Sequence, residues 1–173
     1  VLYDAWGKRR PVFGPLNMGA CRGLNLLLGV SAVPAMISAR WYLALIPVAY
    51  VAAITAVSAG EVHGGKRGAG VLALGLIGGV FAALLALAAT PGFHLLTLLP
   101  FLALLAARVL PPFRRAYLDP QPASIRAAVK AGVLSLIVLD AALAAGYAGM
   151  LYGLLVLALL FAAARIARLF AVT

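Results

Sequence analysis

Residues 58–67 read Ser-Ala-Gly-Glu-Val-His-Gly-Gly-Lys-Arg and separate two apolar runs, Trp41–Val57 and Ala69–Ala89. This polar segment contains a carboxylate, an imidazole and two cations, whereas its flanks are almost entirely hydrocarbon. Charged groups are costly inside a bilayer, so the segment is expected at a water interface or in a hydrated cavity. The pattern predicts two helices that cross a membrane, joined by a polar loop that forms one wall of a site.

The composition predicts a membrane protein. Hydrophobic residues make up 65% of the 173 positions, and the mean hydropathy is +1.10, well above the range of soluble domains. Several runs approach the ~20 residues that span a bilayer. We therefore predict an all-α, polytopic transmembrane helix bundle of about six spans, forming a single transmembrane domain over residues 1–173. The expected spans are Leu16–Ile37, Trp41–Val57, Ala69–Ala89, Phe93–Leu110, Ile125–Ala145 and Met150–Ala171.

Local signals refine these spans. Pro47 predicts a bend in the second span, and Ser124 is expected to cap the fifth helix. The stretch 111–122, rich in proline and arginine, is expected to be a loop. In the third span, glycines predict close contact with a neighbouring helix; they are Gly75, Gly78 and Gly79.

The net charge of +10 comes from 14 Lys and Arg residues against four acids. If the spans alternate in direction, the cations at their ends gather on the side of the polar segment, and the other side receives only Arg40. This asymmetry predicts an integral, multi-pass protein whose polar loops are cytoplasmic, in the inner membrane if the source is bacterial. The expected partners of the cations are membrane lipids, and nucleic-acid binding is not expected.

Three polar side chains are expected deep in the apolar runs. Arg22 and Asn25 are three positions apart and share one helix face,. A guanidinium there is costly unless it faces a cavity or an acid, so both residues are candidates to line a cavity. The alternative for Arg22 is an interior hydrogen-bond network or snorkelling to the membrane edge. Asp140 is expected to pair with a cation or polar group, or to be neutral through burial.

The polar segment has the groups that a phosphate ligand requires. Glu61 can hold Mg²⁺ together with phosphate oxygens, while Lys66 and Arg67 can neutralise phosphate charge beside glycine amides. The alternative is a solvated basic loop with a Glu–Lys pair. His63 can act as a base or ligand but is more simply a surface residue, and no second His or Cys nearby indicates zinc.

Two stretches resemble the UbiA superfamily of membrane prenyltransferases, in particular its EboC-like branch. They are Tyr3-Asp-Ala-Trp-Gly-Lys8-Arg9 and Asn17-Met-Gly-Ala-Cys-Arg-Gly-Leu-Asn25. Tyr3 and Lys8 match the family's Tyr-x4-Lys pair. The family's second acidic motif, Asp-x2-Asp-x3-Asp, aligns with Ser58, Glu61 and Gly65. The resemblance covers essentially the whole chain as the C-terminal portion of a larger UbiA-like bundle, with the first acidic motif expected before Val1.

The resemblance implies a helical bundle around a central cavity, in which a prenyl diphosphate is held through Mg²⁺. Its prenyl group would be transferred to an aromatic or other small lipophilic acceptor. Glu61 would be the catalytic and metal-holding residue, and Arg22 and Asn25 are added from the helix-face argument. The implied substrate-binding residues are then Tyr3, Lys8, Arg22, Asn25, Ser58, Lys66 and Arg67.

The chain departs from the family pattern at two of the three acids in the second motif, which are Ser58 and Gly65. A second hypothesis is therefore a non-catalytic relative that binds or moves an isoprenoid or other lipid. A third is an unrelated transporter segment, which predicts water-accessible polar residues along several helices. An allylic diphosphate needs charge neutralisation and a dry cavity, and the first hypothesis accounts for both requirements.

Overall fold

The computed structural model describes residues 13–170, with side chains described for residues 16–162 and for Arg165. Within this range every regular element is a helix, which confirms the all-α prediction. Its α-helices are α2 (Phe13–Val30), α3 (Ala35–Arg40), α4 (Leu45–Ser58), α5 (Arg67–Ala86), α6 (Leu95–Leu118), α7 (Pro122–Ala148) and α8 (Met150–Phe170), and its short 3-10 helices are η2 (Trp41–Ala44) and η3 (Leu87–Ala89).

Four helical stretches are long and apolar enough to cross a bilayer: Ala35–Ser58, Arg67–Ala89, Leu95–Leu118 and Pro122–Ala148. Large apolar side chains also cover the outer surface; Leu96 is 81% exposed and Phe161 is 73% exposed. Exposing such an apolar surface to water would cost free energy, whereas contact with lipid hydrocarbon does not. The chain therefore has the properties of a membrane-embedded helix bundle.

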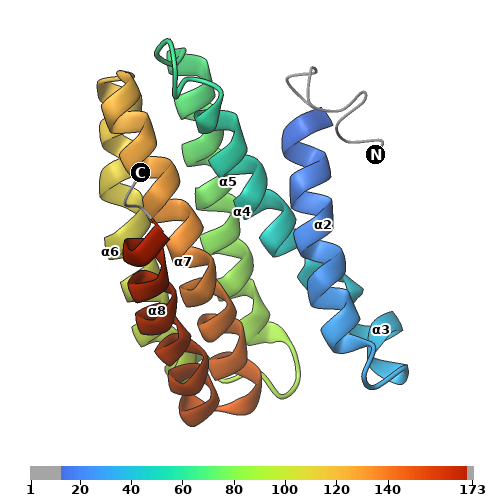
Figure 1. The fold of residues 1–173 in the computed structure, drawn as a ribbon. Coiled ribbons are helices and arrows are strands. Elements are labelled where there is room, and N and C mark those ends of the chain that lie inside the picture. The colour runs from blue at the N-terminus through green and yellow to red at the C-terminus, as the bar shows by residue number, and fades with distance from the viewer. Residues whose placement is uncertain (1–12, 171–173) are drawn as a thin grey trace.

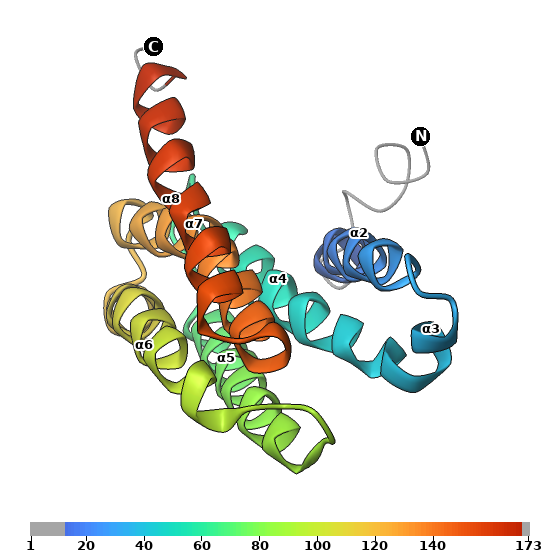
Figure 2. The same cartoon turned by 90° about the horizontal axis from the view of Figure 1, so that it is seen from below.

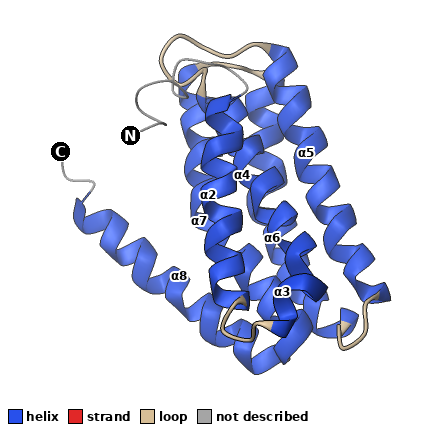
Figure 3. Ribbon diagram, turned by 90° about the vertical axis from the view of Figure 1, so that its right-hand side faces the viewer, coloured by secondary structure: helices blue, strands red, loops and turns tan. Residues whose placement is uncertain are grey.

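The helices run side by side, and the turns between them alternate between two ends of the bundle (Figure 1). Residues 59–66 and 119–121 form what we call the loop end, whereas residues 31–34 and 90–94 lie at the opposite end. Seen from below, α2 lies at one edge and α6 at the other (Figure 2). The last helix, α8, packs on α7 and then diverges from the other helices (Figure 3).

The hydrophobic core lies between α4, α5, α6 and α7. Small residues of α7, including Ala128, Ala141 and Ala145, are completely buried and let the neighbouring helices approach closely,. The large buried side chains come from all four helices and include Tyr50, Ile77, Leu84, Leu98, Leu105, Phe113, Ile125 and Leu139.

The expected first span, Leu16–Ile37, is wrong in its second half. Helix α2 ends at Val30, and a turn over residues 31–34 separates it from α3. Pro34 explains the break, because proline lacks a backbone N–H and disfavours helical geometry in the residue before it. Residues 35–44 therefore belong to the next helical stretch, Ala35–Ser58.

The expected loop over residues 111–122 is also wrong, because α6 continues to Leu118 with Pro111 and Pro112 inside it. Val109 and Phe113 lie on the same buried face of α6, and Phe113 is 1% exposed. The Phe113 ring packs against Gly132 of α7. Burial of this face outweighs the hydrogen bonds that the prolines remove, and prolines are tolerated in this way in membrane helices.

Two smaller expectations concern helix starts. Helix α7 begins at Pro122 with Gln121 as its N-cap, so Ser124 is not the cap; proline is favoured at the first helical position because its missing N–H has no intrahelical partner there. Pro47 lies in the first turn of α4, and the 3-10 helix η2 comes just before this turn. The bend expected at Pro47 stays a prediction.

The three glycines expected to make a close helix contact do not make one, whereas two glycines of α2 do. A Cβ atom on Gly75, Gly78 or Gly79 would meet no described atom within 4 Å. On α2, a Cβ atom on Gly19 would lie 2.7 Å from the carbonyl oxygen of Val48, and Gly23 is similarly close to α4. The pair Gly19 and Gly23 is thus a Gly-x3-Gly contact that holds α2 against α4.

Candidate functional site

An ion pair inside the bundle joins α2 to α7. The guanidinium of Arg22 donates a hydrogen bond to the carboxylate of Asp140, and the two side chains are 33% and 32% exposed. This contact confirms that Asp140 pairs with a cation. It also places Arg22 in the interior hydrogen-bond arrangement that the sequence left open as an alternative, so Asp140 compensates the charge of Arg22.

Asn25 takes no part in this ion pair. It lies about one turn further along α2, where its side chain is exposed and makes no hydrogen bond within the described residues. Its role in lining a cavity stays a prediction.

Three more polar contacts converge on α7. The hydroxyl of Tyr50, on α4, donates to the carbonyl oxygen of Gly132 at 3.0 Å. The Nε of Arg108, on α6, lies 3.4 Å from the hydroxyl oxygen of Ser135. The hydroxyl of Thr97, also on α6, donates to the carbonyl oxygen of Ala145 at 2.6 Å. Together with the ion pair, α7 thus receives one polar contact from each of α2 and α4 and two from α6. In hydrocarbon such contacts fix the positions of neighbouring helices.

The polar segment is held against the turn between α6 and α7. The N–H of Gly65 donates to the carbonyl oxygen of Pro120 at 2.9 Å, and the Ile125 side chain packs against Gly60 and Gly65. Gly64 has a φ of +87°, a backbone conformation that favours glycine,. The glycines of this segment therefore allow it to fold tightly onto the α6–α7 turn.

The candidate residues of the segment all lie at the loop end. Lys66 and Arg67 are exposed at the start of α5, and Glu61 is partly buried. No ion pair joins Glu61 to either cation within the described residues, so the alternative of a Glu–Lys pair is not formed there. The hydroxyl of Ser58 donates to the Thr55 carbonyl of its own helix at 2.9 Å.

The remaining candidates do not complete a metal cluster. His63 is exposed, in agreement with its interpretation as a surface residue. Among the described residues, no group of three or more His, Cys, Asp or Glu side chains could hold a metal ion. Tyr3 and Lys8 lie outside the described residues, so their roles stay predictions.

A groove that the sequence did not reveal lies between α5 and α6 near the loop end. Its volume is about 550 Å³ and its lining is apolar except for Arg114 and Tyr117. Tyr117 packs against Gly70 of α5. The expected loop over residues 111–122 concealed this groove; the spacing of Leu110, Arg114 and Tyr117, which repeats every three to four residues, was the available signal.

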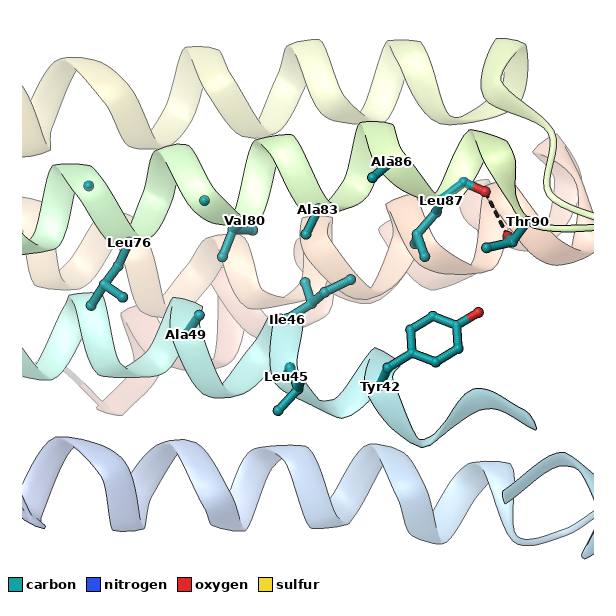
Figure 4. Close-up of a pocket in the computed structure, with 12 residues that line it drawn as sticks. Tyr42, Leu45, Ile46, Ala49, Leu76, Val80, Ala83, Ala86, Leu87 and Thr90 are labelled. Atoms are coloured by element: carbon teal, nitrogen blue, oxygen red, sulfur yellow. Dashed lines mark hydrogen bonds between the residues drawn. The ribbon is translucent and has the colours of Figure 1, made fainter. Parts of the chain in front are cut away.

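A second apolar groove of about 550 Å³ lies between α5 and the η2–α4 segment (Figure 4). Gly75 and Gly79 line it, which explains the open space beside them. Tyr42 and Thr90 lie at its end near the α5–α6 turn, and Thr90 donates its hydroxyl hydrogen bond to Leu87 rather than into the groove. This groove has no charged lining residue.

Comparisons of the chain with protein-family models, with curated proteins and with solved structures found no match. The functional argument therefore depends on the residues and their geometry.

The fold of the polar segment can be tested at Gly60. A Cβ atom there would lie 2.6 Å from the Cα of Gly65, whereas one on Gly68 would meet no described atom within 4 Å. Such overpacking costs about 1–3 kcal/mol, and each 1.4 kcal/mol raises the open population about tenfold. We expect Gly60→Ala to speed tryptic cleavage after Lys66 and Arg67 by about tenfold, and Gly68→Ala to change it little. Equal rates for the two variants would contradict the contact.

Proposed function

We propose that this protein is a multi-pass, UbiA-like membrane protein that binds a prenyl diphosphate at its loop end and transfers the prenyl group to a small lipophilic acceptor. One observation carries the proposal: a segment with a carboxylate and two exposed cations lies at the same end as an apolar groove with an arginine. A prenyl diphosphate has the matching chemistry, a hydrocarbon chain joined to a strongly anionic head. In this proposal α2 and α8 are further spans, giving six, and the loop end is cytoplasmic.

The cations of the loop end would act on the leaving group. Lys66 and Arg67 are exposed and have no carboxylate partner among the described residues, so their charge is available to a diphosphate. When the bond between the allylic carbon and its oxygen breaks, the electron pair leaves with the diphosphate, where these cations stabilise it. The groove beside Arg114 would shelter the prenyl chain from water, which would otherwise capture the allylic cation.

Magnesium fits this end only in a limited way. Glu61 is the single carboxylate of the polar segment, so an ion there would take most of its ligands from diphosphate and water,. When bound, it would supply additional neutralisation of the leaving group. Ser58 and Gly65 offer no carboxylate at the other two positions of the motif.

The second candidate function is non-catalytic binding or movement of an isoprenoid. The observation that favours it is Ser58, which stands at a position where the motif has a carboxylate and donates its hydroxyl hydrogen to its own helix, so a neutral group replaces an anionic metal ligand,. Compensation of Arg22 by Asp140 likewise removes one cation from any anion site.

A binding experiment separates the two candidates. A fluorescent prenyl diphosphate is titrated into the purified full-length protein with and without Mg²⁺. We expect Mg²⁺ to tighten binding about tenfold and Glu61→Gln to abolish that gain, because one carboxylate–metal contact is lost. Lys66→Gln should weaken binding at either Mg²⁺ level, whereas Arg126→Gln, an exposed cation on α7, should change it little.

Each binding result distinguishes between the candidate functions. Tight binding that ignores Mg²⁺ would favour the non-catalytic relative. Absence of binding, or equal effects of Lys66→Gln and Arg126→Gln, would overturn the assignment of the polar segment.

A further inference from the structure

A groove between α2 and α7 opens at the end of the bundle opposite to the loop end. Its volume is about 540 Å³. It begins about one turn beyond the Arg22–Asp140 ion pair, at Leu26 on α2 and Ala144 on α7, and it continues to Arg40 and Tyr147. It is therefore a separate site from the two grooves that border α5.

The polar groups of this groove are gathered at one end. Arg40, the last residue of α3, holds its guanidinium 4.3 Å from the centroid of the Tyr147 ring. The edge of that ring meets Phe93, with ring centroids 4.9 Å apart and planes at 78°. Arg40 is thus held in place by a cation–π contact rather than being free in solvent.

The cation of Arg40 is uncompensated. Within the described residues the single ion pair is that of Arg22 with Asp140, so no carboxylate neutralises Arg40. The Tyr147 hydroxyl is buried and has no hydrogen-bond partner among the described residues. This hydroxyl is enclosed by protein beside Tyr42, so the group that an anion in the groove would compensate is the guanidinium of Arg40.

From this charge complementarity we infer that the groove binds one anionic phospholipid of the surrounding leaflet. An acyl chain lies against Leu26, Val33 and Leu143, and the lipid phosphate meets Arg40. The volume is within the range of small-molecule sites, and an apolar groove in a bilayer is filled by hydrocarbon. The inference requires the membrane embedding of the chain but not the prenyl diphosphate site.

Trp41, adjacent to Arg40 and 56% exposed, provides a local reporter. Trp6→Phe leaves Trp41 as the single tryptophan of residues 1–173, and any tryptophan that the full-length protein has outside these residues is replaced by Phe as well. The fluorescence of Trp41 is measured in nanodiscs that contain phospholipids brominated on the acyl chain, which quench nearby tryptophan. We expect brominated phosphatidylglycerol to quench at about one-tenth the mole fraction that brominated phosphatidylcholine requires, since the phosphate of phosphatidylcholine is already compensated by its own choline cation, whereas that of phosphatidylglycerol leaves a net negative charge for Arg40.

Four variants test the assignment. Arg40→Gln should abolish the preference for phosphatidylglycerol, whereas Arg40→Lys should keep most of it. Gly29→Phe should reduce quenching by both lipids, because Gly29 lines the groove and has no described atom within 4 Å of an added Cβ. The matched control Gly78→Phe is equally open but lies outside the groove, so it should leave quenching unchanged.

Several results would overturn the inference. They are equal quenching by the two lipids in the parent protein, a preference that survives Arg40→Gln, or reversal of quenching by inorganic phosphate or by a prenyl diphosphate. Thermal unfolding midpoints verify that each variant is folded; if Arg40→Gln is not, loss of quenching in Gly29→Phe but not Gly78→Phe decides the question.

Discussion

Asp140→Leu should lower the free energy of unfolding by about 2–4 kcal/mol, because it leaves the Arg22 guanidinium uncompensated inside the bundle. A fully buried pair loses about 3–5 kcal/mol when one partner is removed; the range here is placed lower because the two side chains are 33% and 32% exposed. The midpoint of thermal unfolding in a mild detergent measures the effect, with an expected decrease of roughly 4–16 °C.

The double variant makes this test specific to the pair. Removing both charges, in Arg22→Leu with Asp140→Leu, should restore most of the lost stability, since no unpaired charge remains. If the losses of the two single variants simply add in the double variant, the ion pair is not the source of the effect.

Gly23→Leu should be the second severe change, because a Cβ atom at this position would lie 2.9 Å from the Ala44 carbonyl oxygen. Helix α2 must then move away from α4 and lose its packing there, at a cost of about 1–3 kcal/mol. The loss is measured as the decrease in the midpoint of thermal unfolding.

Gly29→Leu is the matched control on the same helix, since a Cβ atom there meets no described atom within 4 Å. Both substitutions raise helix propensity by about the same amount, so the difference between them reports the contact with α4. Equal midpoints for the two variants would show that α2 does not depend on this contact.

The helical class of the fold was predictable because hydrocarbon content and run length are visible in the sequence. The helix boundaries were less predictable from the sequence, for two different reasons. The break at Pro34 could have been recognised from local chemistry. The continuation of α6 through Pro111 and Pro112 could not, because it depends on burial of Phe113 against a helix that comes later in the chain.

The polar residues show the same division. Arg22 and Asp140 were both recognised as costly in hydrocarbon, but nothing local reveals that residues 118 positions apart are partners. The contact of Arg108 with Ser135 likewise depends on how α6 and α7 pack. Periodicity identifies the face of a helix, but it does not identify which helix that face meets.

The same limit applies to the glycines. Gly75, Gly78 and Gly79 form a more obvious small-residue stripe than Gly19 and Gly23, yet only the latter pair touches a neighbouring helix. Small residues permit close approach without requiring it.

The polar contacts of α7 also bear on the order in which the protein is made. Their partners all precede α7 in the chain: Arg22, Tyr50, Thr97 and Arg108. A ribosome therefore delivers these groups to the membrane before their acceptors exist, and the nascent bundle carries an unmatched guanidinium until α7 is inserted. Arrival of this one helix satisfies all of them, so it completes assembly, and chains interrupted before residue 122 would be the ones that quality-control proteases recognise.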